Sequence, residues 1–326
     1  MQDVTVIGAG VIGLTTAICL AEAGARVAVH AAQPPDQTTS MAAGALWGPH
    51  LVGADERVPG WAEMTRRTLR ELMAHSFVRE CAGVSATAPA TGQAMGQLPE
   101  GAPPAEVTAC AAGDVPPGYA QAWRYSAPLV SMPEYLGYLH ERYRRAGGQP
   151  VAPASYPALA AAARAVGSPV LVNCSGTGAR SLVPDPDVVA VRGQVVIIRN
   201  PGITEFFVGV GGPLAELTYV FPHVGRVVLG GTEQEGDWRL EPDPAAARRI
   251  LTACAAVVPA VAGADVVAHR VGLRPLRSSV RLEAERDENG TTIVHNYGHG
   301  GSGVTLSWGC AREAATLALT ALDGRP

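Results

Sequence analysis

The sequence predicts an α/β fold in which a Rossmann-like domain is interleaved with a strand-rich α+β domain. Residues 2–30 have a strand, turn, helix and strand pattern. Two further apolar runs lead into glycine-rich turns, in residues 169–179 and 291–305, and strand-rich sequence lies between these pieces. With 326 residues the chain exceeds what one hydrophobic core usually serves. We therefore expect two domains that alternate along the sequence.

The opening segment has the glycine spacing of a dinucleotide-binding fingerprint. An apolar strand at 4–7 is followed by a helix at 14–23 and a second strand at 26–29. In this pattern the first glycine permits a sharp turn, the second lets the backbone approach a pyrophosphate, and the third lets the helix pack on the strand. The helix N-terminus favours an anion. The candidate cofactor-binding residues are Gly8, Ala9, Gly10, Val11, Ile12 and Gly13. An ordinary glycine-rich turn is the alternative.

One part of the fingerprint is missing at the end of the second strand. A carboxylate usually stands there and binds the ribose hydroxyls. Here residues 30–33 read His-Ala-Ala-Gln. We expect Gln33 or the backbone to hold the ribose instead. No arginine stands there to bind a 2′-phosphate, which disfavours NADP.

Composition limits the classes of function. A hydrophobic content of 47% with 17% charged residues suits a soluble globular enzyme. A net charge of −4 gives no strong field to attract nucleic acid or an anionic membrane. The six cysteines form no CxxC pair and no metal-ligand spacing. We expect no metal site and a reducing, cytoplasmic location, because the chain also has no signal-peptide pattern and no run of membrane-spanning length.

Composition and apolar periodicity predict the elements over residues 38–146. Residues 38–50 form a small, hydroxylated, glycine-bearing stretch, either an ordinary loop or a loop beside a flat cofactor ring. Apolar spacing predicts a helix over 58–81 and short strands and loops over 82–120. Residues 119–130 look extended. A helix is expected over 132–146, with Pro133 in its first turn.

The second half alternates strands and helices. Residues 169–173 form a buried strand before a glycine-rich turn, and strands dominate from 192 to 231. A helix is expected at 242–258, with strands at 271–282 and 291–296. A glycine-rich turn at 298–303 precedes a helix to 322. Such a helix N-terminus can stabilise the negative charge at the N1–C2=O edge of a reduced flavin. A helix start capped by a flexible loop is the alternative.

Together these segments resemble the D-amino acid oxidase family over nearly the whole chain. The matching segments are residues 8–14, 38–49, 172–176, 192–194, 219–222, 229–232, 272–277, 295–303 and 308–311. The Arg-Pro-x-Arg sequence at 274–277 and the His-Asn-Tyr-Gly sequence at 295–298 are specific in this order and spacing. The glycine fingerprint alone is not.

The resemblance implies a non-covalent FAD and an oxidase reaction. The FAD-binding domain would comprise 1–50, 131–185 and 265–326, and the substrate-binding domain 51–130 and 186–264. A D-amino acid would lose hydride from Cα to flavin N5, and the imino acid would hydrolyse to a 2-oxo acid and ammonia. O₂ would reoxidise the flavin and yield hydrogen peroxide. A homodimer is left open. The further implied FAD-binding residues are Thr39, Ser40, Gly44, Ala45, Leu46, Ser175, Gly300, Gly301, Gly303, Val304 and Thr305.

Three residues match the family's substrate-binding and catalytic positions. Arg274 matches the arginine that binds the substrate carboxylate, which suits its planar fork. Tyr219 matches the tyrosine whose hydroxyl meets the same carboxylate, and Gly301 the glycine whose carbonyl accepts from the amine. Without the resemblance, the alternatives are that Arg274 forms a structural ion pair and that Tyr219 belongs to the core. The family needs orientation and electrostatics rather than a strong base.

Neighbouring residues receive structural roles. Arg277 lies three residues after Arg274, so an extended strand points it to the other face. We do not assign His299 as a general base and expect a turn histidine bonded to the backbone. Ala215 stands where animal relatives carry a lid tyrosine, which makes a long lid doubtful. Ser302 stands where an aromatic can occur, which predicts a roomier pocket.

The substrate is the least determined part of the prediction. His50 resembles a histidine of the D-aspartate oxidase branch, but no clear second arginine accompanies it; Arg226 and Arg239 are candidates with turn-like surroundings. Neutral D-amino acids are favoured, with D-aspartate oxidase or glycine oxidase as alternatives. A non-catalytic flavin or nucleotide-binding module and an NAD-linked dehydrogenase are alternatives from other classes.

Overall fold

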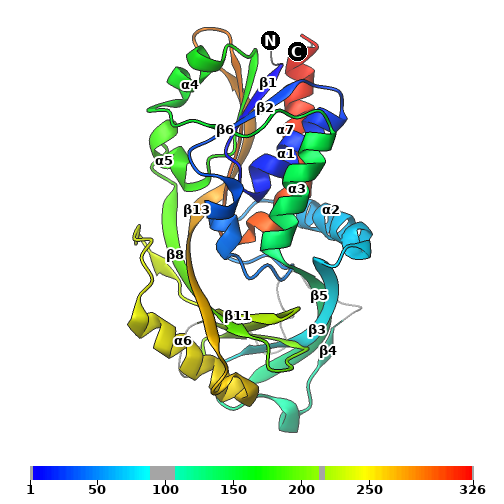
Figure 1. Ribbon diagram of the computed structural model, residues 1–326, viewed down its shortest axis with the longest axis vertical. Helices are drawn as coiled ribbons and strands as arrows, with labels where there is room; N and C mark the ends of the chain where they lie inside the picture. The colour runs from blue at the N-terminus through cyan, green and yellow to red at the C-terminus, as the bar shows by residue number, and fades with distance from the viewer. Residues whose placement is uncertain (1–2, 89–106, 213–216, 325–326) are drawn as a thin grey trace.

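The computed structural model describes residues 3–88, 107–212 and 217–324. Within these residues one continuous 14-stranded sheet runs through the protein. Figure 1 shows α1, α3 and α7 at the end of the molecule that carries both chain termini, and α6 at the other end. The long strands β8 and β13 run between the two ends. The sheet is therefore shared by both ends of the molecule.

The strands and helices have the following bounds. In sheet order the strands are β4 (Thr108–Ala109), β5 (Gln121–Val130), β3 (Val78–Thr87), β9 (Phe206–Val210), β10 (Leu217–His223), β11 (Arg226–Gly230), β8 (Val189–Arg199), β13 (Val266–Arg286), β14 (Thr292–His299), β7 (Val170–Asn173), β1 (Val4–Ile7), β2 (Val27–Ala31) and β6 (Ala152–Pro153). β12 (Gln234–Glu235) pairs with β8 off this path. The α-helices are α1 (Val11–Glu22), α2 (Val58–Glu71), α3 (Met132–Arg145), α4 (Leu159–Val166), α5 (Ala179–Leu182), α6 (Pro244–Val257) and α7 (Gly303–Leu322).

The nucleotide-type end is built on parallel strands. β1 pairs in parallel with β2 and β7, and β7 pairs in parallel with β14. All four residues of β1 are buried, as expected for a parallel strand covered on both faces. The hydroxyl groups of Thr5 and Ser168, 2.7 Å apart, satisfy each other in this core.

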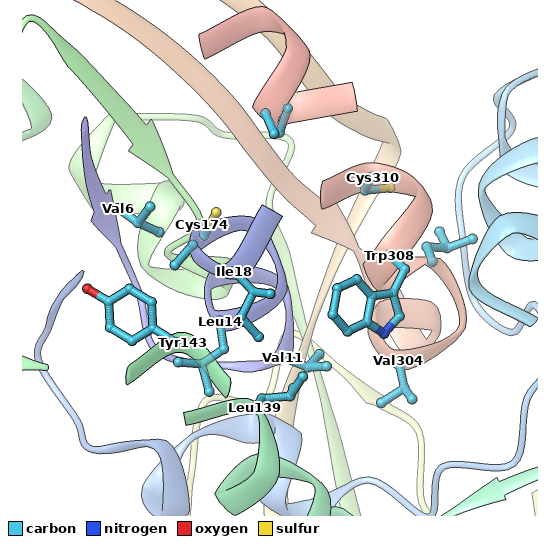
Figure 2. Packing of buried hydrophobic residues seen from close by; sticks show 14 of the residues in the cluster. Val6, Val11, Leu14, Ile18, Leu139, Tyr143, Cys174, Val304, Trp308 and Cys310 are labelled. Atoms are coloured by element: carbon cyan, nitrogen blue, oxygen red, sulfur yellow. The ribbon is translucent and has the colours of Figure 1, made fainter. Parts of the chain in front are cut away.

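Three helices pack their apolar side chains together beside this sheet. Figure 2 shows Leu14 and Ile18 of α1 facing Trp308 of α7, with Leu139 and Tyr143 of α3 on the other side. Trp308 is almost fully buried, and its indole Nε1 donates to the Tyr135 hydroxyl at 2.8 Å. This packing fixes the N-termini of α1 and α7 relative to each other.

β13 connects the two ends through its own length. Its first half pairs with β8, from Val266 to Leu276, and its second half pairs with β14, from Leu276 to Arg286. The register with β14 shifts between Leu276 and Arg281. Because Arg274 lies just before this change of partner, it stands where the two ends of the sheet meet.

Most of the expected elements are confirmed, including the opening strand–helix–strand unit. Asp243 starts α6 by accepting from the Ala245 N–H at 2.8 Å. The expected helix over 58–81 is wrong at its end. α2 stops at Glu71, and residues from Val78 form β3, because this segment pairs with both β5 and β9. The helix α4 and the short strand β6 were not predicted from the sequence.

The remaining expectations concern the domain boundaries, the lid position, membrane-spanning helices and metal sites. The domain boundaries remain a prediction; α2, which that prediction places in the substrate-binding domain, packs against α7. Ala215 lies outside the described residues. Among the described helices, none combines the length and apolar character needed to cross a bilayer. The described residues contain no cluster of three or more metal-ligating side chains.

Candidate active site

A cavity of about 670 Å³ lies where the glycine-rich segments converge. Its walls come from the β1–α1 turn, the end of β2, residues 38–50, the turn after β7, the middle of β13 and the start of α7. β10 closes it through Leu217, Tyr219 and Phe221. Segments that are far apart in the sequence thus form one site, with the size of a small-molecule or cofactor pocket.

The β1–α1 turn has the geometry that the glycine spacing predicts. Gly8 has φ +114°, and a Cβ on it would lie 2.3 Å from the Cys174 carbonyl oxygen. A Cβ on Gly13 would lie 1.9 Å from the Gly8 carbonyl oxygen, so α1 packs directly on the turn. Gly13 does not line the cavity, unlike residues 8–12. Its contribution is close packing, because its Cα faces the backbone rather than the pocket.

The N-terminus of α1 faces the cavity with little competition from side chains. Gly10 is the N-cap residue and offers no side-chain cap. The Val11 N–H donates to Ser40 Oγ at 3.0 Å, and a Cβ on Gly10 would lie 3.1 Å from the same oxygen. Ser40 therefore marks the cavity wall opposite the helix start, where a phosphate would meet the helix dipole.

The end of β2 supplies the region expected to hold a ribose. Ala31, Ala32 and Gln33 line the cavity, as do Ser155 and Tyr156 after β6. The Tyr156 hydroxyl and His30 Nδ1 are 2.7 Å apart. Gln33 was predicted for this place from the sequence, but Ser155 and Tyr156 were not. The strand that delivers them pairs through only two residues, which leaves no periodic signal.

Residues 38–50 line the cavity with small side chains and backbone. Thr39 Oγ1 donates to the Leu273 carbonyl at 3.2 Å, and the Val130 N–H donates to the Ala45 carbonyl at 3.0 Å. A Cβ on Gly44 would lie 2.5 Å from the Phe221 ring. Thr39, Ser40, Gly44, Ala45 and Leu46 all line the cavity, as does Ser175 across from them. The segment is thus a fixed wall rather than a free loop.

Hydroxyl groups in and just before the first turn of α7 fix the end of this wall. Ser302 Oγ donates to the His50 carbonyl at 2.8 Å, and Thr305 Oγ1 donates to the Gly48 carbonyl at 2.9 Å. Gly300, Gly301, Gly303, Val304 and Thr305 line the cavity. Ser302 does not, because it is fully buried and its hydroxyl pairs with backbone. The expectation that a serine here leaves a roomier pocket than an aromatic would stays a prediction.

Arg274 of β13 and Tyr219 of β10 reach the same part of the cavity, although β11 and β8 separate their strands in the sheet. Arg274 Nη1 donates to the Thr232 carbonyl at 2.9 Å. Burial raises the pKa of Tyr219, and the nearby Arg274 guanidinium acts in the opposite direction. The Tyr219 ring stacks on Phe221 with centroids 4.6 Å apart. Gly301 also lines this cavity, so the three predicted substrate-binding residues lie around one space.

Arg277 has the structural role that was expected. Its Nε donates to Asp185 Oδ2 at 3.0 Å, and the Tyr297 hydroxyl donates to the same oxygen at 2.7 Å. Hydrogen bonds to Arg277 and Tyr297 lower the pKa of Asp185 against the effect of burial. The ion pair ties β13 to the segment between α5 and β8. Arg274 and Arg277 therefore serve different faces of the strand.

Two buried polar atoms on cavity-lining residues have no hydrogen-bond partner among the described residues. They are Asn296 Oδ1 and His299 Nε2. Burial lowers the pKa of His299 to about 3, so the imidazole stays neutral at ordinary pH. The expected bond from His299 to the backbone is absent at Nε2. Unpaired buried polar atoms are costly, which is consistent with a polar ligand that completes them.

The donor set fits a flavin dinucleotide along the cavity. The α1 N-terminus suits a pyrophosphate, and the end of β2 with Gln33 and Tyr156 suits a ribose. The start of α7 offers a second positive helix end for the electron-rich edge of an isoalloxazine ring. Small residues at 42–45 permit close approach of a flat ring.

Comparisons with known proteins agree with this geometry. Residues 3–317 match the model of the family DAO, described as FAD dependent oxidoreductase. A D-amino-acid oxidase of Rubrobacter xylanophilus is 44% identical, with 98% of this chain and 96% of that protein covered. The human D-aspartate oxidase is 34% identical, covering 96% and 94%. The structure of glycine oxidase from Geobacillus kaustophilus has a TM-score of 0.76 at 18% identity, covering 100% and 95%.

Proposed function

The chain belongs to the DAO family of FAD-dependent oxidoreductases, and from this premise we propose that it is a D-amino acid oxidase. Its products would be a 2-oxo acid, ammonia and hydrogen peroxide. The observation that carries this proposal is the placement of Arg274, Tyr219 and Gly301 around one cavity beside the two glycine-rich turns. An NAD-linked dehydrogenase does not fit the family, and a pure binding module does not explain this set of residues.

The substrate would be held by groups that match an amino acid. The Arg274 guanidinium would bind the carboxylate as a fork, with the Tyr219 hydroxyl as a second donor. The Gly301 carbonyl would accept a hydrogen bond from the amine. Burial raises the pKa of Tyr219, so the phenol stays protonated and can donate. These contacts would point the Cα–H bond of the D-form toward the cofactor and that of the L-form away from it, and this is the basis of selectivity for the D-form.

FAD, when bound, supplies the two-electron oxidant, and its reoxidation by O₂ yields hydrogen peroxide. Residues 8–12, Thr39, Ser40, Gly44 to Leu46, Ser175 and the start of α7 would hold it. We propose that it is bound non-covalently. Cys174 lines the cavity, but burial raises its pKa to about 12, so it is a poor nucleophile for attachment. His299 is buried and neutral and is not proposed as a base.

A cytoplasmic location is also proposed. All six cysteines are free, which is consistent with a reducing compartment. The homodimer stays a prediction. Neutral D-amino acids are the proposed substrates, with D-aspartate and glycine as the alternatives within the family.

Peroxide release from the FAD-loaded protein tests the proposal directly. The panel contains D- and L-amino acids, D-aspartate and glycine. Peroxide with neutral D-forms and none with the L-forms is the expected result. Activity chiefly on D-aspartate or glycine would select one of the alternatives. A yellow protein that releases no peroxide with any of them would return the chain to a flavin-binding module.

A further inference from the structure

A partly buried hydrogen-bonded pair adjoins the substrate end of the cavity and has no part in the roles assigned above. His50 Nε2 and Glu233 Oε1 are 2.6 Å apart. His50 ends the wall formed by residues 38–50, and Glu233 follows β11. The side chain of Glu233 is 21% exposed and that of His50 41% exposed. The pair therefore lies at the boundary between the cavity and solvent.

The pair adjoins both of the expected substrate anchors. His50 lines the cavity, and a Cβ on Gly301 would lie 2.9 Å from His50 Cδ2. Glu233 directly follows Thr232, whose carbonyl accepts from Arg274 Nη1. His50 thus lies beside Gly301, the residue expected to bind the amine. Glu233 lies beside Thr232, which contacts Arg274, the residue expected to bind the carboxylate.

The charge of Glu233 acts on this clamp. Burial raises the pKa of Glu233, but the hydrogen bond and charge of His50 and the charge of Arg274 outweigh it, so the net shift is downward. The group is therefore ionised at neutral pH. In turn, the negative charge of Glu233 contributes to raising the pKa of Tyr219. A carboxylate thus stands within electrostatic reach of both Arg274 and Tyr219.

The pairing also removes the feature that pointed to acidic substrates. His50 is the residue that resembles the D-aspartate oxidase branch, but its Nε2 is already engaged by Glu233. The two candidate second arginines have other partners, since Arg239 pairs with Asp237 at 2.6 Å and Arg226 with Glu134 at 2.8 Å. When a substrate carboxylate occupies Arg274, Glu233 remains as a negative charge that is hydrogen-bonded to His50.

We propose that Glu233, held by His50, sets the charge preference of this site, admitting D-amino acids with neutral or cationic side chains and disfavouring a second carboxylate. The proposal rests on the D-amino acid oxidase function proposed above and narrows its substrate class. Glu233 does not itself line the cavity, but its charge acts on Arg274 and Tyr219, which do. A second carboxylate bound beside Arg274 would therefore be repelled by Glu233, because partly buried charges are screened less than exposed ones. A cationic substrate side chain would instead be attracted by the negative charge of Glu233.

Substrate pairs that differ only in charge test this preference. The FAD-loaded wild type, Glu233→Gln and Glu235→Gln are assayed for peroxide with D-asparagine against D-aspartate and D-glutamine against D-glutamate, and with D-lysine. Glu235 is the matched control because it is exposed, lies two residues on and loses the same charge. We expect the wild type to prefer each amide over its acid by at least a hundredfold in kcat/KM.

Glu233→Gln is expected to reduce that preference at least tenfold, through a lower KM for the acids, and to raise KM for D-lysine about tenfold. The kcat for D-asparagine should stay within about twofold, and Glu235→Gln should keep the wild-type ratios. A purely structural role would instead lower activity on all substrates together. Unchanged ratios in an active Glu233→Gln, or a wild type that prefers D-aspartate, would overturn this inference.

A measurement on the wild type keeps the test independent of folding in the variant. Raising NaCl from about 20 mM to about 500 mM screens like-charge repulsion. The kcat/KM for D-aspartate should then rise relative to that for D-asparagine, and parallel salt responses would contradict the inference. Failure of the parent proposal looks different, because then no D-amino acid of either charge gives peroxide.

Discussion

The Arg274 guanidinium lies against the Cα of Gly193, so that a Cβ on Gly193 would be 2.5 Å from Nη1 and 2.6 Å from both Cζ and Nη2. The two residues belong to the paired strands β13 and β8, where Gly193 faces Gly272 in the register. Because the three guanidinium atoms are almost equidistant from that point, the planar group faces the glycine. The direction of Arg274 therefore depends on a missing side chain in the next strand.

Gly193→Ala is expected to displace Arg274 without touching the substrate itself. A methyl group cannot occupy a point 2.5 Å from Nη1, so the guanidinium must move and lose its alignment with the Thr232 carbonyl. We expect kcat/KM for D-amino acids to fall roughly 10- to 100-fold, since misplacement by about 1 Å is costly in catalysis. Steady-state peroxide assays measure the loss, and the FAD absorbance checks that the cofactor remains.

Gly137→Ala is the control for this change. Gly137 is exposed in α3, and a Cβ there meets no atom within 4 Å. Alanine is the better helix former by about 1 kcal/mol, so this variant should be at least as stable as the wild type and fully active. Wild-type kinetics in Gly193→Ala would show that the guanidinium is free to adjust.

Arg274→Ala should abolish detectable turnover and leave the yellow flavin bound. The substrate carboxylate would lose its fork, and lysine could not restore the bidentate geometry, so Arg274→Lys should also be severely impaired. Arg286→Ala, at the exposed end of the same strand, is the control for losing one cation. Near-normal activity in Arg274→Ala would mean that another residue binds the carboxylate.

Gly10→Val should give colourless protein. The Cβ alone would stand 3.1 Å from Ser40 Oγ, and the two branches would fill the space where the pyrophosphate meets the start of α1. The ratio of flavin to protein absorbance after purification measures the loss. Gly60→Val, exposed on α2 with no atom within 4 Å of its Cβ, should keep its FAD. Stoichiometric FAD in Gly10→Val would refute the phosphate-loop assignment.

The elements that local pattern predicts well are those with a strong period or a demanding turn. The β1–α1–β2 unit follows from continuous apolar runs and from glycines whose Cβ positions are occupied by backbone. The end of α2 could not be predicted, because residues 78–81 have apolar spacing compatible with a helix. Their backbone instead pairs with β5, which lies far away in the sequence.

In the candidate site, too, some residues could be predicted from the sequence and others could not. Arg274, Tyr219 and Gly301 were predicted from motif resemblance, and the structure brings them to one cavity. Gly193 was included in a matching segment without a role, since its importance depends on the register between β8 and β13. Glu233 was missed altogether, because its partner His50 is 183 positions away and no local pattern connects them.

Acidification should destabilise the protein through a buried histidine outside the expected reaction. His223 of β10 is 7% exposed, and burial, together with the charge of Arg226, lowers its pKa from 6.5 to about 4. Between these pH values the unfolded chain binds a proton that the folded chain does not. The free energy of unfolding therefore rises with pH across this window and falls as the pH drops. From pH 7 to pH 5, His223 alone should remove about 2 kcal/mol.

Urea unfolding of the FAD-loaded protein at pH 7 and pH 5 measures this effect as a difference between two pH values. His223→Gln changes the packing at both pH values alike. The difference in unfolding free energy between pH 7 and pH 5 therefore loses only the contribution from proton uptake by His223. We expect its pH dependence to be smaller than that of the wild type by about 2 kcal/mol. His269→Gln, on an exposed part of β13, should keep the wild-type dependence. Equal pH dependence in all three proteins would mean that His223 is already protonated in the folded chain above pH 5, in spite of its burial.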